Sequence, residues 1–255
     1  MKSIESLYTN VPWSKGKVIL MAYAGSIAYG TNTPTSDIDL RGILIPPQDF
    51  YYGLDSFESY HSPEGDRTED DVVVYSIKKY ANLALQNNPN VLEMLFTNPK
   101  HYTILNRFGR ELCRARYNFL SKKTFNTFSG YALAQLHRMT QNEGKPTHGQ
   151  GNPERQKIRE QFGYDTKAAM HLVRLMRMGL EILRDGNLIV HRPDAEELLD
   201  IKRGKYTLQE IVEEHDRLYE QMKYWKEASD LPEKPNRDKV NSFIIELTKE
   251  FLGGK

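Results

Sequence analysis

A buried strand followed by a Gly-Ser turn and two closely spaced aspartates constrains the fold of this chain more than any other feature. The apolar residues 18–24 predict a buried strand, and Gly25 and Ser26 follow it directly. Glycine lets the backbone approach a ligand closely, while the N–H groups of the following turn and the Ser26 hydroxyl point toward that ligand. Because phosphate oxygens suit such donors, Gly25 and Ser26 are predicted to bind phosphate.

Two carboxylates come next along the chain. Residues 37–45 predict a second strand, in which Asp37 and Asp39 project to one face while Ile38 faces the core. Two adjacent carboxylates repel each other unless a divalent cation lies between them, and hard oxygen ligands favour Mg²⁺ or Mn²⁺. Asp37 and Asp39 are therefore candidate catalytic and metal-ligating residues. Arg41 follows on the same strand face and either contacts phosphate or pairs with the aspartates.

The combination of these elements resembles a known signature. A strand, a Gly-Ser pair, a loop over residues 27–36 and an Asp-x-Asp pair within an apolar strand are similar to the signature of the DNA polymerase β-like nucleotidyltransferase superfamily. The longer string at residues 25–42 resembles one branch of it, the predicted nucleotidyltransferases associated with RNA repair pathways. Residues 88–95 and 163–177 are similar to the same branch.

The resemblance implies an α+β fold, in which a mixed-sheet, polymerase β-like nucleotidyltransferase domain over residues 1–115 is followed by a mostly helical domain over residues 116–255. The apolar periodicity agrees, since from about residue 102 onward it predicts helices. These helices cover residues 105–115, 119–142, 161–184, 208–227 and 236–252. Polar loops are predicted at residues 59–68 and 143–153.

The superfamily commonly uses a third carboxylate, carried by a strand beside the one that holds the Asp-x-Asp pair. The resemblance therefore implies such a residue in the acidic cluster that opens the β-branched run at residues 72–75. We select Asp71, because it leads directly into this run, with Glu69 and Asp70 as alternates. Its role would be to hold the catalytic metal and to help deprotonate the attacking hydroxyl. The alternative is an ordinary solvated strand entry.

One predicted helix carries a row of cationic side chains. Lys167, His171 and Arg174 lie at positions i, i+4 and i+7 and therefore share one helix face. Such a face either binds a triphosphate or the backbone of an acceptor, or is solvated. The similarity of this segment to the same branch favours a functional face, and Lys167, His171 and Arg174 are assigned to nucleotide binding. Asp165 is expected to cap this helix. Glu93 lies among apolar neighbours and is expected to be partly buried and paired rather than catalytic.

Charge is distributed unevenly, although the whole chain has a formal net charge of +1. Residues 1–99 hold 7 Lys and Arg against 12 Asp and Glu, whereas residues 100–192 hold 17 against 7. An acidic metal-binding module followed by a basic segment suits an enzyme with polyanionic substrates, because cations neutralise the phosphates that carboxylates repel. The alternative is that a helical domain simply carries solvated Lys and Arg side chains.

Composition disfavours several classes of protein. No apolar stretch is long enough for a membrane span, and the first six residues lack the apolar core of a signal peptide, so a cytoplasmic protein without a membrane partner is expected. Cys113 is the only cysteine, which excludes an intramolecular disulfide and a cysteine-based zinc site. The sequence contains no lysine-bearing phosphate loop, which disfavours a kinase or ATPase of that kind.

The predicted function is transfer of a nucleoside monophosphate from a nucleoside triphosphate to an acceptor hydroxyl. Asp37, Asp39 and Asp71 would hold two Mg²⁺ or Mn²⁺ ions, which stabilise the in-line displacement of pyrophosphate. The resemblance implies an RNA end as the acceptor. Two alternatives stand beside it: transfer to a protein or small molecule, and a nucleotide-binding regulatory subunit without turnover. No oligomeric state is predicted.

Overall fold

The structure is a computed structural model that describes residues 11–62, 71–140 and 153–253. The chain divides into two compact units. The first contains Met1–Leu120, Ile189–Arg192 and Lys234–Lys255, and the second contains Ser121–Leu188 and Pro193–Glu233. The prediction divided the chain into two continuous domains at residue 115. In the structure, the first compact unit also contains the short segment Ile189–Arg192 and the last helix.

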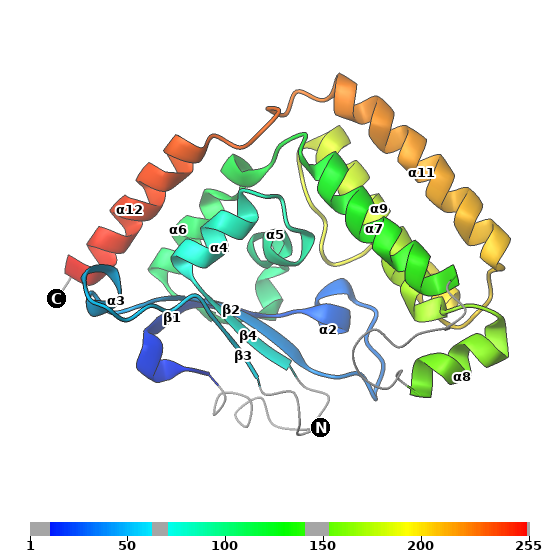
Figure 1. The fold of residues 1–255 in the computed structure, drawn as a ribbon, viewed down its shortest axis with the longest axis horizontal. Coiled ribbons are helices and arrows are strands. Elements are labelled where there is room, and N and C mark those ends of the chain that lie inside the picture. The colour runs from blue at the N-terminus through cyan, green and yellow to red at the C-terminus, as the bar shows by residue number, and fades with distance from the viewer. Residues whose placement is uncertain (1–10, 63–70, 141–152, 254–255) are drawn as a thin grey trace. The chain divides into compact units, whose positions relative to one another are not determined.

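A five-stranded mixed sheet lies at the centre of the first unit, in the order β3-β4-β2-β1-β5 (Figure 1). The strands are β1 (Lys17–Tyr23), β2 (Asp39–Ile45), β3 (Ser59–His61), β4 (Asp71–Ser76) and β5 (Tyr102–Leu105). β2 and β4 are parallel, whereas β1 is antiparallel to both β2 and β5. Because β1 has a neighbour on each side, its apolar residues 18–22 are all buried.

The strand register brings four strand ends together. β1 ends at Tyr23, which pairs with Leu40, so β2 begins beside it at Asp39. Asp39 pairs in turn with Asp71, the first residue of β4. β5 begins at Tyr102, beside the last residues of β1. We call this side of the sheet the carboxylate end.

The two faces of the sheet are packed differently. Helices α4 (Ile77–Ala84), α5 (Pro89–Phe96) and α6 (Arg107–Arg114) lie on one face, and α12 (Arg237–Gly253) packs against α4 (Figure 1). The other face carries an apolar cluster, against which Ile38 packs as predicted. Its buried members include Val18, Met21, Leu40, Leu44, Val72 and Val74. Since side chains alternate along a strand and Leu40 belongs to this cluster, Asp39 projects toward the helical face.

Short helical segments connect these elements. They are η1 (Trp13–Lys15), α2 (Gly25–Tyr29), α3 (Asp49–Tyr52), η2 (Pro99–His101) and η3 (Arg116–Phe119). α2 follows β1 directly and ends at Gly30, whose left-handed φ of +74° terminates the helix.

The second unit consists of helices grouped around α9. They are α7 (Thr124–Thr140), α8 (Pro153–Phe162), α9 (Thr166–Asp185), α10 (Ala195–Lys202) and α11 (Leu208–Ala228). α9 contacts each of the other four, and Asp165 caps it as predicted, because its carboxylate accepts a hydrogen bond from the Ala168 N–H. No helix in the described part of the chain is long and apolar enough to cross a membrane.

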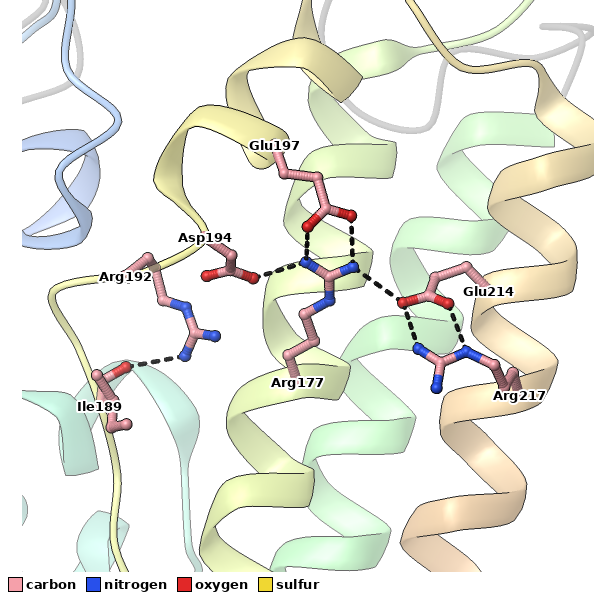
Figure 2. Close-up of polar contacts among 7 residues, drawn as sticks. All are labelled: Arg177, Ile189, Arg192, Asp194, Glu197, Glu214 and Arg217. Carbon is pink, nitrogen blue, oxygen red and sulfur yellow. Dashed lines mark hydrogen bonds and ion pairs between the residues drawn. The ribbon is translucent and has the colours of Figure 1, made fainter.

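Arg177 joins three segments of the second unit. Its guanidinium donates to the carboxylates of Asp194, Glu197 and Glu214 over 2.7–3.0 Å (Figure 2). Burial acts to lower the pKa of Arg177, but hydrogen bonds to these three carboxylates outweigh it and raise the pKa. Arg177 therefore stays charged and ties α9 to α10, to α11 and to Asp194, which directly precedes α10.

Several local predictions were wrong. β2 begins at Asp39 rather than at residue 37, and residues 27–29 of the predicted loop lie in α2. Ser59–His61 and Tyr102–Leu105 form strands, because each pairs with a strand distant in the sequence. The helix predicted over residues 161–184 is interrupted at Gly163, where φ is +81°. The predicted loop at residues 143–153 lies almost wholly outside the described residues.

Candidate active site

Asp39 and Gly25 are in direct contact at the carboxylate end. A Cβ atom added to Gly25 would lie 1.9 Å from Oδ2 of Asp39, so the carboxylate rests against the glycine backbone. Gly25 also has a φ of +56°, in the left-handed region that favours glycine. The Ala24 N–H donates to the Asp39 carbonyl at 2.9 Å, which fixes the end of β1 against the start of β2. Any larger residue at position 25 would displace the aspartate.

Asp71 lies beside Asp39 in the neighbouring parallel strand. The two residues are paired in register, and adjacent strands lie about 4.8 Å apart, so both side chains leave the same face of the sheet. Oδ1 of Asp71 accepts a hydrogen bond from the Ser62 hydroxyl at 2.8 Å. Asp37 is partly buried in the segment that leads into β2. The structure therefore brings the three predicted aspartates to one end of the sheet, whereas Glu69 and Asp70 lie outside the described residues.

The donor chemistry of this end fits a hard divalent cation. Carboxylate oxygens are the ligands that Mg²⁺ and Mn²⁺ prefer, and Asp39 and Asp71 lie in register on adjacent strands, with Asp37 two residues before Asp39. Within residues 11–62, 71–140 and 153–253, no group of three or more His, Cys, Asp or Glu side chains already converges to hold a metal ion. Asp37, Asp39 and Asp71 are thus candidate ligands by chemistry and position, and no coordination geometry follows from the structure.

Arg41, two residues after Asp39 on β2, is paired with the buried Glu93. Its Nη1 donates to Oε1 of Glu93 at 2.9 Å and to the Asn90 carbonyl at 3.0 Å, while the Tyr29 hydroxyl donates to Oε2 of Glu93 at 2.7 Å. Burial acts to lower the pKa of Arg41, but the charge of Glu93, with a smaller contribution from Asp39, outweighs it and raises the pKa. Glu93 is therefore buried and paired, as predicted, and links β2 and α2 to α5.

Replacing Glu93 by alanine is expected to lower the free energy of unfolding by about 3 kcal/mol, as measured by chemical denaturation. The Glu93 side chain is only 4% exposed, so its removal leaves the Arg41 charge and the Tyr29 hydroxyl without their partner. We take the low end of the usual range because the Arg41 side chain is 23% exposed. The control is Glu58→Ala, which removes an exposed partner of Lys79 and should leave stability unchanged. Equal stability of the two variants would show that the buried pair does not hold β2 to α5.

Two histidines lie at this end of the first unit and were not predicted as part of the site. The His191 ring packs on Gly30, since a Cβ atom there would lie 2.7 Å from Cε1 of the ring. The Arg192 N–H donates to the Tyr29 carbonyl at 3.0 Å, which fastens this segment to the end of α2. His101 packs edge-on to His191, with ring centroids 5.7 Å apart, and burial followed by the neighbouring His191 lowers the pKa of His101. No local sequence pattern could have joined residues 30, 101 and 191.

The three predicted cationic residues of α9 differ in exposure. Lys167 is exposed, His171 is partly buried and Arg174 is only 3% exposed. Nη1 of Arg174 lies 3.2 Å from Sδ of Met178. These residues belong to the second unit, whereas the aspartates belong to the first. Nucleotide binding by Lys167, His171 and Arg174 stays a prediction.

The described elements define a class of protein. A mixed sheet that carries a Gly-Ser turn and in-register aspartates at one end, combined with many helices, is an α+β fold of the nucleotidyltransferase kind. The family described as the RNA repair pathway DNA polymerase beta family matches residues 2–246, and the chain belongs to this family. Membership confirms the resemblance that the sequence motifs indicate.

Two individual proteins are also similar to this chain. The "Uncharacterized 38.9 kDa protein in nrdC-mobD intergenic region" of Enterobacteria phage T4 is 33% identical over 90 residues. That match covers 33% of this chain and 27% of the phage protein, so the chain spans about a quarter of this relative. A solved structure, of a nucleotidyltransferase-like protein from Exiguobacterium sibiricum 255-15, shares 10% identity at a TM-score of 0.30, over 88% of this chain and 72% of that one. The assignment to the family rests on the family match alone.

Proposed function

We propose that the protein transfers a nucleoside monophosphate from a nucleoside triphosphate to a hydroxyl of an RNA end, in a reaction that depends on Mg²⁺ or Mn²⁺. The observation that carries this proposal is the carboxylate end, where Asp39 rests on Gly25 and lies in register with Asp71. The family supports the general chemistry. The RNA acceptor is supported by the pathway in the family's description and by the basic middle third of the sequence.

Each residue of the carboxylate end has a proposed task. Asp37, Asp39 and Asp71 would hold the divalent metal ions, which when bound neutralise charge on the phosphates and on the attacking and leaving oxygens. The Ser26 hydroxyl and the N–H groups that follow Gly25 would donate to oxygens of the triphosphate. Asp71 is exposed at the start of β4, where it would accept the proton of the attacking hydroxyl.

The helical unit would supply positive charge. Lys167, His171 and Arg174 are proposed to neutralise the triphosphate as pyrophosphate leaves, because charge-assisted hydrogen bonds to phosphate are stronger than neutral ones. Lys167 is the exposed member of the three, so we assign it the direct contact.

The experiment is incubation of the purified protein with each α-labelled nucleoside triphosphate and a mixed pool of RNA, in Mg²⁺, Mn²⁺ or EDTA. We expect label in RNA only when a divalent metal ion is present, with one nucleotide preferred. A parallel pool of RNA is treated with periodate, which destroys the terminal 2′,3′-diol. Loss of labelling in that pool would place the acceptor at the 3′ end.

Two outcomes would favour an alternative function over transfer to RNA. Label in the protein itself or in an added small molecule, with none in RNA, would favour a different acceptor. Metal-dependent binding of nucleotide without transfer to any acceptor would favour a regulatory subunit. A nucleotide that binds equally well in EDTA would contradict the metal dependence.

A further inference from the structure

Helix α6 presents a row of arginines on its exposed side. Arg107, Arg110 and Arg114 are spaced by three and four residues, so they share one face of the helix, and all three are exposed. The opposite face is buried and includes Phe108 and Leu112. Residues 107–119 contain four arginines and one acidic residue. This α6 arginine row is therefore a local concentration of positive charge on the first unit.

The three arginines are weakly engaged within the protein. Arg107 pairs with Glu250 at 2.9 Å, but both side chains are more than half exposed, and such pairs contribute little. Arg110 donates to the Leu105 carbonyl at 2.9 Å. The Arg114 guanidinium has no hydrogen-bond or ion-pair partner among the residues that the structure describes. These guanidinium groups therefore keep donors for an external anion.

An aromatic platform lies at the C-terminal end of the row. The Arg116 guanidinium lies over the rings of Phe96 and Tyr117, at 5.1 and 5.0 Å from their centroids, and donates to the Tyr117 hydroxyl at 3.1 Å. Phe96 and Tyr117 meet edge-on with centroids 5.8 Å apart. Tyr117 is nevertheless 52% exposed, so a large aromatic ring with neighbours on one part is open to solvent on another. Such a ring suits stacking of an unpaired base.

The row and the platform lead toward the carboxylate end. β5 begins at that end with Tyr102, and α6 returns antiparallel to β5, so that the Cys113 sulfur lies 3.5 Å from the Tyr102 hydroxyl. Arg114 to Tyr117 follow Cys113 directly. α6 also lies on the same face of the sheet as the Asp39 side chain, and all of these residues belong to the first unit (Figure 1). A single-stranded nucleic acid bound along α6 would therefore be directed toward the aspartates.

We propose that the α6 arginine row and the Arg116–Tyr117 platform form the docking surface for single-stranded RNA, whose acceptor end then reaches the carboxylate end. Backbone phosphates bind the arginines and a base stacks on Tyr117. A membrane surface is disfavoured, because the apolar side chains of α6 are buried rather than exposed beside the arginines. This inference rests on the proposed RNA acceptor.

The test is binding of a labelled 12-nucleotide single-stranded RNA across a salt series, without nucleoside triphosphate. For single strands each phosphate contact contributes about 0.7 to the slope of log affinity against log salt, so Arg107→Gln/Arg110→Gln/Arg114→Gln should reduce the slope by about 2. Tyr117→Ala should leave the slope unchanged and weaken binding about 5- to 150-fold, which is the effect of one lost base stack. Glutamine is a good helix former, so the triple variant should keep its fold, as checked by circular dichroism.

A control variant removes the same number of positive charges from the second unit. Arg184→Gln/Arg203→Gln/Lys223→Gln removes three exposed cations of the second unit and should leave the salt slope unchanged. A wild-type slope in the α6 triple variant would overturn the docking surface while the RNA acceptor stands. A wild-type protein that binds nucleoside triphosphate but not RNA would overturn both, and an acidic protein would become the partner to test.

Discussion

Replacing Asp39 by asparagine is expected to lower nucleotidyl transfer at least about a thousandfold. Asparagine keeps the shape that lies against Gly25, but it removes the negative charge through which Asp39 would hold a metal ion. A thousandfold loss corresponds to about 4 kcal/mol of transition-state stabilisation, the scale on which metal-ion charge acts. The measurement is the rate of label transfer to RNA, with chemical denaturation to confirm that stability is kept, because the Arg41–Glu93 pair is untouched.

The matched control is Asp49→Asn. Asp49 opens α3 beyond the opposite end of β2 and is exposed, so its loss of charge should leave transfer at the wild-type rate. An Asp39→Asn protein that retained more than about a tenth of wild-type activity would contradict metal binding by Asp39. A metal-binding titration monitored by calorimetry gives a second readout, independent of turnover.

The central part of the fold was predictable because its signals are local. The run at residues 18–24 is apolar without interruption, which is typical of a strand with neighbours on both sides, and β1 is such a strand. The alternation around Ile38 likewise predicted which side chain would face the core. The family resemblance added the adjacent strand with a third carboxylate, and the structure places Asp71 in register with Asp39. Whether Asp71 acts in catalysis stays a prediction.

The parts of the fold that the sequence did not predict depend on contacts with residues distant in the sequence. Ser59–His61 becomes a strand by pairing with β4, and Tyr102–Leu105 by pairing with β1. Both are short segments, of three and four residues, so no period of hydrophobicity could identify them. The return of Ile189–Arg192 to the first unit is similar, since the contact of His191 with Gly30 joins residues more than a hundred positions apart. Chain order therefore predicted the helical second half but not how residues are shared between the units.

The glycine that begins α2 and the glycine that follows it have contacts that a sequence motif does not reveal. Gly25 was predicted to let the backbone approach a phosphate, which stays a prediction. The structure shows a different requirement, since Asp39 occupies the space where a side chain would be. Gly30 is required for the same reason, because the His191 ring lies where a side chain at position 30 would be. Both glycines also have positive φ values, of +56° and +74°. The motif thus encodes contacts with two residues outside the helix, as well as a turn.

Replacing Gly25 by alanine is therefore expected to lower transfer about a hundredfold or more. The new Cβ cannot share space with Oδ2 of Asp39, so the carboxylate must turn away or β1 must separate from β2. A misplacement of about 1 Å in a catalytic group costs about 10²-fold in rate. The left-handed φ adds about 1 kcal/mol of strain, so stability should fall only modestly. The rate of label transfer and a denaturation curve separate the two effects.

Substitutions at two other glycines separate the steric effect on Asp39 from the strain of a left-handed φ. Gly163→Ala introduces a side chain at a φ of +81° with no atom within 4 Å, so it carries the strain without the contact, and Gly130→Ala carries neither. Both should transfer label at the wild-type rate. In the Asp39→Asn background, Gly25→Ala should add little further loss, because both changes act on the same side chain. Independent, additive losses in the double variant would mean that Gly25 acts on the phosphates alone and not through the position of Asp39.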